Sequence, residues 1–510
     1  MKQIPLYILV TLFVAVACNK TPENPTITPY AETKLDENGG TWKTYILADG
    51  SEIPVPAPNA VASDAYKTEL EQLKTVMSNA TESDKEAVQF WGSNGTLRWH
   101  EIARELAANY NVPPNYNADG TYPAPDPNNP TAYPRFPFAN PPYASRAFAL
   151  LAVAQYDALV TAWKAKFEHN RLAPYKNDSG ITPLLPTNDL PSYPSEDAVV
   201  AAASREVLKF LFPGEVALLD ERSTEHKNSR LWGGMNVQSD IDAGDSIGVA
   251  VAKRIIAYAK TDRMGAANKQ ADYPLLKADA TARGLTAQWE SVDIPARPPM
   301  LPFFGNVKPW NFTDDQKITL RPAAPYLPGT PEFEKDYQEM LDLVKNRTRE
   351  QFRIATYWAD GAGSYTPPGH WNRKAAELII ENKWNELRAA RAMALMGTAV
   401  QDAGILCWHT KYYYLTQRPT TVDADIKTST GIPNFPGYTS GHSTFSAAAA
   451  EVLAYLFPSN ASELNAMAKE ASESRIYGCI HFRIDCEAGL ESGKKVGTFA
   501  VERGKNDGSE

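Results

Sequence analysis

Three short stretches of the chain, at 411–419, 436–442 and 474–485, carry side chains that could together hold a tetrahedral oxyanion. They supply three cations, one hydroxyl, two imidazoles and a carboxylate, all within about eighty residues. This set suits an anion such as phosphate, together with a histidine that attacks its central atom.

The cations of this set are Lys411, Arg418 and Arg475. The planar guanidinium of arginine binds an oxyanion through two parallel, charge-assisted hydrogen bonds, and lysine adds a compact charge. Together they could surround one oxyanion and stabilise the charge that develops in a transition state. Arg418 precedes Pro419, which favours an extended conformation at a helix end. Any one of these residues alone would be better explained as a solvated surface cation.

Ser440, Gly441 and His442 open an alanine-rich segment that is expected to be helical. Ser440 would cap this helix, and the free backbone N–H groups that follow would point at an anion, aided by the helix dipole. His442 at the same end could deliver a proton to a leaving oxygen. The plain alternative is a helix cap followed by a buried histidine.

His481 and Asp485 are four residues apart, which places them on one face if that stretch is helical. The carboxylate could accept a hydrogen bond from one imidazole nitrogen and fix the tautomer, leaving the other nitrogen free to attack. The same spacing also occurs as a plain surface pair. All three stretches follow one another within one region, which favours a catalytic role for this pair over a plain surface pair.

The spacing Lys-x6-Arg-Pro, Ser-Gly-His and Ser-Arg-x5-His-x3-Asp resembles the signature of the superfamily that joins type 2 phosphatidic acid phosphatases, acid phosphatases and vanadium haloperoxidases. The resemblance implies that phosphate or vanadate is held by Lys411, Arg418, Ser440, Gly441 and Arg475. It implies that His442 is the acid–base. His481 would be the nucleophile of a phosphatase or the vanadium ligand of a peroxidase, with Asp485 orienting it. One departure is Thr439, where the phosphatases often have proline.

Further resemblance favours the haloperoxidase branch. Residues 402–411 and 435–440 look like the haloperoxidase versions of the first two stretches, and 357–361 resembles an upstream loop whose aspartate pairs with the site arginine. By that match Asp360 would partner Arg418, and Trp408 and Phe435 would wall the anion pocket. Ordinary core packing is the alternative for both aromatic residues.

The elements that must position these residues are predicted to be helices. Apolar residues recur at three- and four-residue spacing between proline-rich connections, no strand pattern of any length appears, and no repeat of fixed period is evident. The fold class is therefore all-α, with helical bundles of the haloperoxidase and acid phosphatase type implied by the resemblance. We expect Ser145 to cap one helix and 372–414 to form one or two long helices. An N-terminal helical region at 61–300 and a catalytic helical domain at 301–510 are predicted.

Charge limits the partners. The 51 lysines and arginines against 60 aspartates and glutamates give a net charge of −9, which argues against nucleic acid and anionic lipid surfaces as partners. Any anion site must therefore be built by a few cations that lie close together. No Cys/His cluster predicts zinc, and no Walker-type glycine loop appears.

The N-terminus predicts export. Residues 1–18 resemble a bacterial lipoprotein signal, with a positive start, an apolar stretch and small residues before Cys18, which would be lipidated. An ordinary secretory signal is the alternative. Residues 19–60 are expected to form a flexible tether. The expected location is the cell envelope of a bacterium, with a lipid anchor in the periplasm or outer membrane as the one membrane contact. Cys479 and Cys486 could pair only if the chain is irregular between Cys479 and His481.

Three functions remain open from the sequence. The first is peroxide-dependent halide oxidation at a vanadate bound to His481, with small-molecule substrates. The second is hydrolysis of phosphate monoesters through a phospho-His481 intermediate, with no cofactor. The third is a non-catalytic envelope binding lipoprotein, which predicts loss of signature residues, and none is lost.

Overall fold

The computed structural model describes residues 27–510, and its regular elements are helices. Within those residues there is no β-strand, and one isolated bridge joins Gln288 to Thr416. The all-α prediction is therefore confirmed. The predicted signal at 1–18, with Cys18, lies outside the described residues, as does the first part of the predicted tether.

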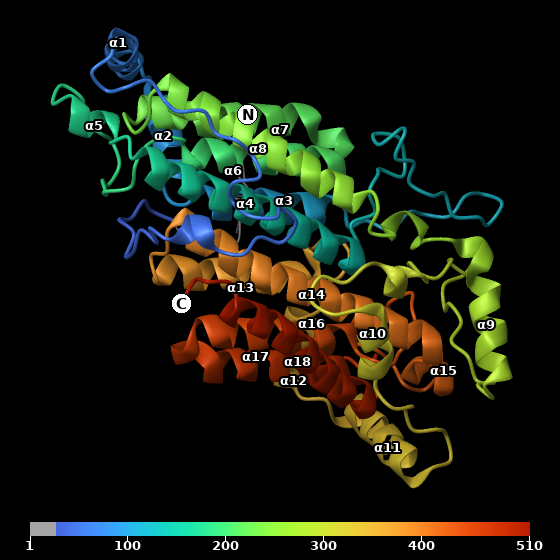
Figure 1. The fold of residues 1–510 in the computed structure, drawn as a ribbon. Coiled ribbons are helices and arrows are strands. Elements are labelled where there is room, and N and C mark those ends of the chain that lie inside the picture. Colours follow the sequence, from blue (N-terminus) through green and yellow to red (C-terminus); the bar gives the residue numbers. More distant parts are fainter. Residues whose placement is uncertain (1–26) are drawn as a thin grey trace, which may run out of the picture.

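Two helical bundles are stacked on each other, one blue to green and the other gold to red (Figure 1). The N-terminal bundle consists of α1 (Asp64–Ser78), α2 (Glu82–Trp91), α3 (Gly95–Tyr110), α4 (Pro141–His169), α5 (Pro174–Asn177), α6 (Glu196–Leu211), α7 (Val216–Trp232) and α8 (Gln238–Ala259). The C-terminal bundle consists of α11 (Pro331–Asn346), α12 (Arg349–Tyr357), α13 (Thr366–Glu381), α14 (Glu386–Tyr414), α15 (Pro419–Val422), α16 (Gly441–Leu456), α17 (Ala461–Tyr477) and α18 (Arg483–Lys505). Between them the chain forms α9 (Tyr273–Ala282) and α10 (Asp314–Leu320).

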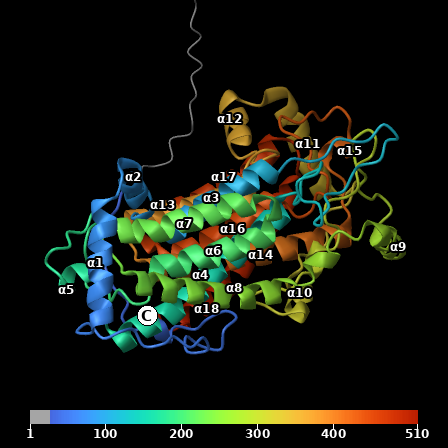
Figure 2. The ribbon, with the colours of Figure 1, turned by 90° about the horizontal axis from the view of Figure 1, so that it is seen from above.

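Helices α4 and α14 form the centre of the molecule, where they pack against each other. Each is 29 residues long and buried over most of its length, because alanine and large apolar residues surround its axis. The other long helices run beside them when the molecule is seen from above (Figure 2). One hydrophobic core continues through both bundles. The boundary near residue 300 therefore stays a prediction.

Two helix boundaries differ from the sequence prediction. Ser145 lies inside α4, which begins at Pro141 because Asn140 is the cap and accepts the N–H of Tyr143 at 3.1 Å. Proline is tolerated at a first helical position, where its missing N–H is not needed. The stretch 372–414 spans two helices, α13 and α14, and Asn385 caps the second.

The predicted flexible tether at 19–60 is wrong for the segment around Trp42, which is 1% exposed. The backbone N–H groups of Tyr45, Ile46 and Leu47 donate to the buried carboxylate of Asp157 at 2.8–3.1 Å. A buried carboxylate needs such donors, so this contact fixes the segment on α4.

Two further expectations concern cysteines and the membrane. The described cysteines Cys407, Cys479 and Cys486 are all buried and free, so Cys479 and Cys486 do not pair. Across residues 27–510, none of the helices combines the length and the apolar character needed to cross a bilayer.

Candidate active site

Four helices of the C-terminal bundle and the segment before α15 bring the predicted site residues together. Lys411 lies near the end of α14, and the segment before α15 carries Arg418. Arg475 lies in the last turn of α17, and Asp485 in the first turn of α18. The start of α16 supplies Ser440, Gly441 and His442. Residues separated by more than seventy positions therefore meet where several helix ends converge.

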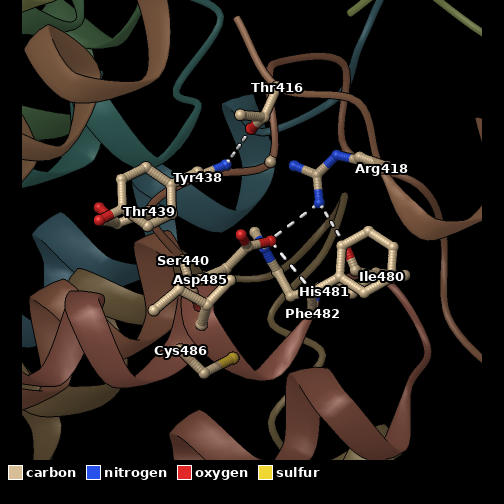
Figure 3. Close-up of polar contacts among 12 residues, drawn as sticks. Thr416, Arg418, Tyr438, Thr439, Ser440, Ile480, His481, Phe482, Asp485 and Cys486 are labelled. Carbon is tan, nitrogen blue, oxygen red and sulfur yellow. Dashed lines mark hydrogen bonds and ion pairs between the residues drawn. The ribbon is translucent and has the colours of Figure 1, made fainter. Parts of the chain in front are cut away.

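His481 and Asp485 form the centre of this arrangement (Figure 3). Nδ1 of His481 lies 2.9 Å from Oδ2 of Asp485, and Nε2 lies 3.3 Å from a terminal nitrogen of Arg418. Because α18 begins at Arg483, the pair spans the helix start and does not lie within a helix. The carboxylate of Asp485 accepts a hydrogen bond from Nδ1, and Arg418 can only donate to Nε2. Nδ1 therefore carries the proton, and Nε2 presents its lone pair.

Burial lowers the pKa of His481 well below its ordinary value, and the charges of Arg418 and Lys411 lower it further. Burial raises the pKa of Asp485 to about 7, while Lys411 and Arg418 act in the opposite direction. The imidazole is therefore neutral at physiological pH, which keeps Nε2 available as a nucleophile or ligand.

Three buried cations surround this pair, each held by neutral oxygen atoms. Lys411 donates to the carbonyls of residues 436 and 437 at 2.8 and 2.7 Å. Arg418 donates to the carbonyls of residues 435 and 480 at 3.0 and 2.8 Å. Arg475 donates to the hydroxyl of residue 474 at 2.8 Å and to the carbonyl of residue 355 at 3.0 Å. In the described part of the chain, no carboxylate lies within salt-bridge distance of any of the three.

None of these cations has a carboxylate of the described residues in direct contact, although Asp485 acts on Lys411 and Arg418, and Asp360 on Arg475, from a greater distance. Burial lowers the pKa of Lys411 to about 7 and the pKa values of Arg418 and Arg475 to about 10. Removing charges from water without a counter-charge is costly. A bound oxyanion would offset that cost, so the donor set fits a phosphate or vanadate group.

The start of α16 provides backbone donors and a second imidazole. Ser440 caps the helix by accepting the N–H of Ser443 at 3.4 Å, and its own N–H donates to the carbonyl of Asp485 at 2.8 Å. Gly441 lines the adjacent cavity. The enclosed Nε2 of His442 has no hydrogen-bond partner. Burial lowers the pKa of His442 well below its ordinary value, with the charge of Arg475 adding to the effect.

A cavity of about 250 Å³ adjoins these groups. The site residues that line it are Gly441, His442, Arg475, His481, Asp360, Trp408 and Phe435. The rings of Trp408 and Phe435 lie 4.9 Å apart, and Lys411 and Arg418 lie 5.0 and 5.1 Å from the centre of the Phe435 ring. Both aromatic residues therefore line the cavity beside the cation cluster.

The predicted partnership of Asp360 with Arg418 is wrong. Asp360 lies 3.4 Å from Nδ1 of His370, and its charge acts on Arg475. The donors of Arg418 are already used by carbonyl groups and by His481. His409, two residues before Lys411, points to another group: its Nε2 contacts Arg321 at 3.2 Å.

The sequence prediction missed the outer wall of the cavity. That wall comes partly from the N-terminal bundle, through Asn111 and Phe138, and partly from Arg297 and Met300. The Nδ2 of Asn111 donates to the carbonyl of Gly361 at 2.9 Å and so supports the loop that carries Asp360. These residues lie in irregular connections whose spacing carries no periodic signal, so sequence patterning gave no means of finding them.

Comparisons with known proteins give a family match and similar folds. Residues 389–502 match the family model described as the PAP2 superfamily. The fold is similar to a bacterial vanadium-dependent iodoperoxidase, with 24% identity, a TM-score of 0.54, and coverage of 71% of this chain and 91% of that one. It is also similar to a bacterial vanadium-dependent chloroperoxidase in its holo form, with 15% identity, a TM-score of 0.50, and coverage of 75% and 96%. The apo form matches with 15% identity, a TM-score of 0.51, and coverage of 71% and 93%. Among curated proteins, none matches the chain.

Proposed function

We propose that this chain, whose segment 389–502 belongs to the PAP2 superfamily and whose fold is that of vanadium haloperoxidases, is a vanadate-dependent haloperoxidase. The family indicates an enzyme of phosphatase or haloperoxidase type. The observation that carries the proposal is the neutral His481, whose Nε2 faces a cluster of buried cations beside a cavity of about 250 Å³.

The residues present fit vanadate. Nε2 of His481 would be its ligand, and its oxygen atoms would be held by Lys411, Arg418, Arg475 and the start of α16. The unpartnered Nε2 of His442 and the cations without a carboxylate partner support this fit. When bound, vanadate would supply a Lewis-acid centre that activates hydrogen peroxide towards a halide ion.

The chain's own residues have separate tasks in this reaction. Asp485 holds the proton on Nδ1 of His481 and so fixes the ligating tautomer. Nε2 of His442 can exchange a proton with a bound ligand, because that atom has no hydrogen-bond partner within the protein. Trp408 and Phe435 restrict water at the cations, which strengthens the electrostatic interactions there. The overall reaction converts peroxide, a halide ion and a proton into a hypohalous acid and water.

Phosphatase activity is the second candidate, because the same geometry suits attack on phosphorus. Nε2 of His481 would form the bond to phosphorus, and His442 would protonate the leaving alcohol. The similarity of the fold to vanadium-dependent haloperoxidases favours the haloperoxidase, whereas the cavity wall with Trp408, Phe435 and Met300 suits either a halide or the apolar alcohol portion of an ester. A non-catalytic binding role ranks lower, because no signature residue is missing.

Two assays on the full-length protein separate these functions. We expect the protein loaded with vanadate to oxidise bromide or iodide in a peroxide-dependent manner, and the vanadate-free protein to show little hydrolysis of p-nitrophenyl phosphate. His481→Ala should abolish the oxidation. His409→Ala, which changes a histidine of α14 outside the cation cluster, should retain it. Strong phosphate-ester hydrolysis that vanadate inhibits, without halide oxidation, would establish the phosphatase instead.

Export with lipidation of Cys18 is a separate part of this proposal, and the sequence around Cys18 supports it. Cells fed a labelled fatty acid should incorporate the label into the wild-type protein, and Cys18→Ser should lose it. Labelling that persists in Cys18→Ser would contradict the anchor.

A further inference from the structure

The two bundles repeat one arrangement of helices at a constant distance along the chain. Helices α4, α6, α7 and α8 begin at residues 141, 196, 216 and 238, and α14, α16, α17 and α18 begin at 386, 441, 461 and 483, each time 245 residues later. The first three pairs have identical lengths of 29, 16 and 17 residues. Figure 1 shows the two sets in the upper and lower bundles.

Side-chain contacts repeat with the same offset. In the N-terminal bundle, Nε of Arg146 lies 2.6 Å from Asp262, and in the C-terminal bundle Nε of Arg391 lies 2.6 Å from Asp507. The sequence Glu-Val-Leu-x-x-Leu-Phe-Pro also occurs twice, at 206–213 and 451–458. The repeat therefore extends from backbone geometry to individual residues.

The anion site has a counterpart in the N-terminal bundle. Lys166 takes the position of Lys411, and each donates to the carbonyl of an equivalent proline, at 2.6 and 2.8 Å. Arg230 takes the position of Arg475, and each donates from Nε to the hydroxyl of the preceding serine, at 3.1 and 2.8 Å. Ser195 takes the position of Ser440 as a helix cap.

The groups that would act on a bound anion are replaced in this counterpart. Ala173 stands where the C-terminal site has Arg418, and Asn236 stands where it has His481. Glu196 and Asp197 take the positions of Gly441 and His442 at the start of the equivalent helix. Both replacements at the helix start introduce carboxylates where the other bundle has none.

These two carboxylates pair with the cations that remain. Oε2 of Glu196 lies 2.6 Å from Nζ of Lys166, and Oδ2 of Asp197 lies 3.3 Å from a terminal nitrogen of Arg230. Lys411 and Arg475 have no such partner in the C-terminal bundle. The cavity lined by Glu196, Asp197 and Arg230 is about 70 Å³, against about 250 Å³ in the C-terminal bundle. One terminal nitrogen of Arg230 is buried there without a partner.

We propose that the N-terminal bundle contains a second oxyanion site that is closed by the protein's own carboxylates, with Glu196 and Asp197 in the place of the anion. Carboxylate oxygen atoms supply the negative charge that the buried lysine and arginine require. The wild-type chain consequently binds one tetrahedral oxyanion, in the C-terminal bundle. Removing both carboxylates restores room and positive charge for a second oxyanion of the phosphate or vanadate type.

The number of oxyanions bound per chain tests this proposal. Equilibrium dialysis of the full-length protein against vanadate, and separately against labelled inorganic phosphate, should give one ion per wild-type chain. Glu196→Gly combined with Asp197→His reproduces the local sequence of the C-terminal site and should bind one additional ion. Adding Arg230→Met to that double variant removes a cation of the second site and should return the number to one.

Two results would overturn the proposal: two ions bound by the wild-type chain, or a double variant with wild-type helical content that gains no ion. If the double variant does not fold, Glu196→Gly combined with Asp197→Asn replaces it, because asparagine keeps the size of Asp197 while both negative charges are removed. A folded replacement variant that gains no ion also overturns the proposal. A wild-type chain that binds none, with a variant that binds one, would refute the proposed function but support the closed second site.

Discussion

Oxyanion affinity should depend steeply on pH, because Lys411 is fully buried and burial lowers its pKa to about 7. A bound anion favours the charged ammonium and raises this pKa. The affinity for the oxyanion is therefore highest below pH 7 and falls as the pH rises above 7. Asp485, whose pKa burial raises to about 7, loses its proton in the same range and repels the anion further.

The magnitude follows from the fraction of Lys411 that is protonated. With a pKa of about 7, half of the free protein carries the ammonium at pH 7 and roughly one molecule in a hundred at pH 9. The dissociation constant should therefore rise roughly 50-fold over this range, equivalent to about 2.3 kcal/mol, from the lysine alone. Sulfate is a suitable probe, because it remains a dianion across the whole range.

Titration calorimetry with sulfate from pH 7 to pH 9 measures this dependence. Lys411→Gln should weaken binding. It should also reduce the slope of the logarithm of the dissociation constant against pH by about one. Lys317→Gln is the matched control, since Lys317 is a buried lysine that donates to the carbonyl of Gly305 outside the site, and it should leave the slope unchanged. A wild-type dissociation constant that changes less than about fivefold, or an unaltered slope in Lys411→Gln, would refute the reasoning.

Three further predictions address the support of the site, the fold and the thiols. Asp485→Asn should reduce catalytic activity or oxyanion affinity by about 10- to 100-fold, because the tautomer of His481 is no longer fixed, and steady-state kinetics on a folded variant measures the loss. Asp402→Ala should lower the free energy of unfolding in urea by about 3 kcal/mol, because buried donors of residues 310 and 311 lose their acceptor; a loss under about 1 kcal/mol would contradict this. Adding a reductant should leave the melting temperature unchanged, because the described cysteines are free, and a decrease would reveal a disulfide.

Local spacing accounts for the part of the site that the sequence predicted. His481 and Asp485 are four residues apart, and the start of a helix is enough to bring them within 2.9 Å. Ser440 stands directly before an alanine-rich helix and caps it as its type and position predict. Such features depend on a few neighbouring residues, so they can be recognised without the fold.

Contacts between distant segments were not predictable in the same way. Asp360 acts on Arg475 because α12 packs against α17, and no spacing within either segment specifies that choice. The outer wall formed by Asn111 and Phe138 depends on how the two bundles stack. The expectation that the chain has no repeat of fixed period was wrong, because the two copies of Glu-Val-Leu-x-x-Leu-Phe-Pro belong to a repeat with an offset of 245 residues. That period is far longer than those of ordinary repeat proteins.

The most direct test of the proposed function is a titration of vanadate-free protein with vanadate, with peroxide-dependent bromide or iodide oxidation followed at each step. We predict that the rate rises until one vanadium is bound per chain and then stays constant, that inorganic phosphate competes, and that His481→Ala shows no rise. An oxidation rate that does not depend on vanadium, or one that persists in His481→Ala, would contradict a vanadate site centred on His481.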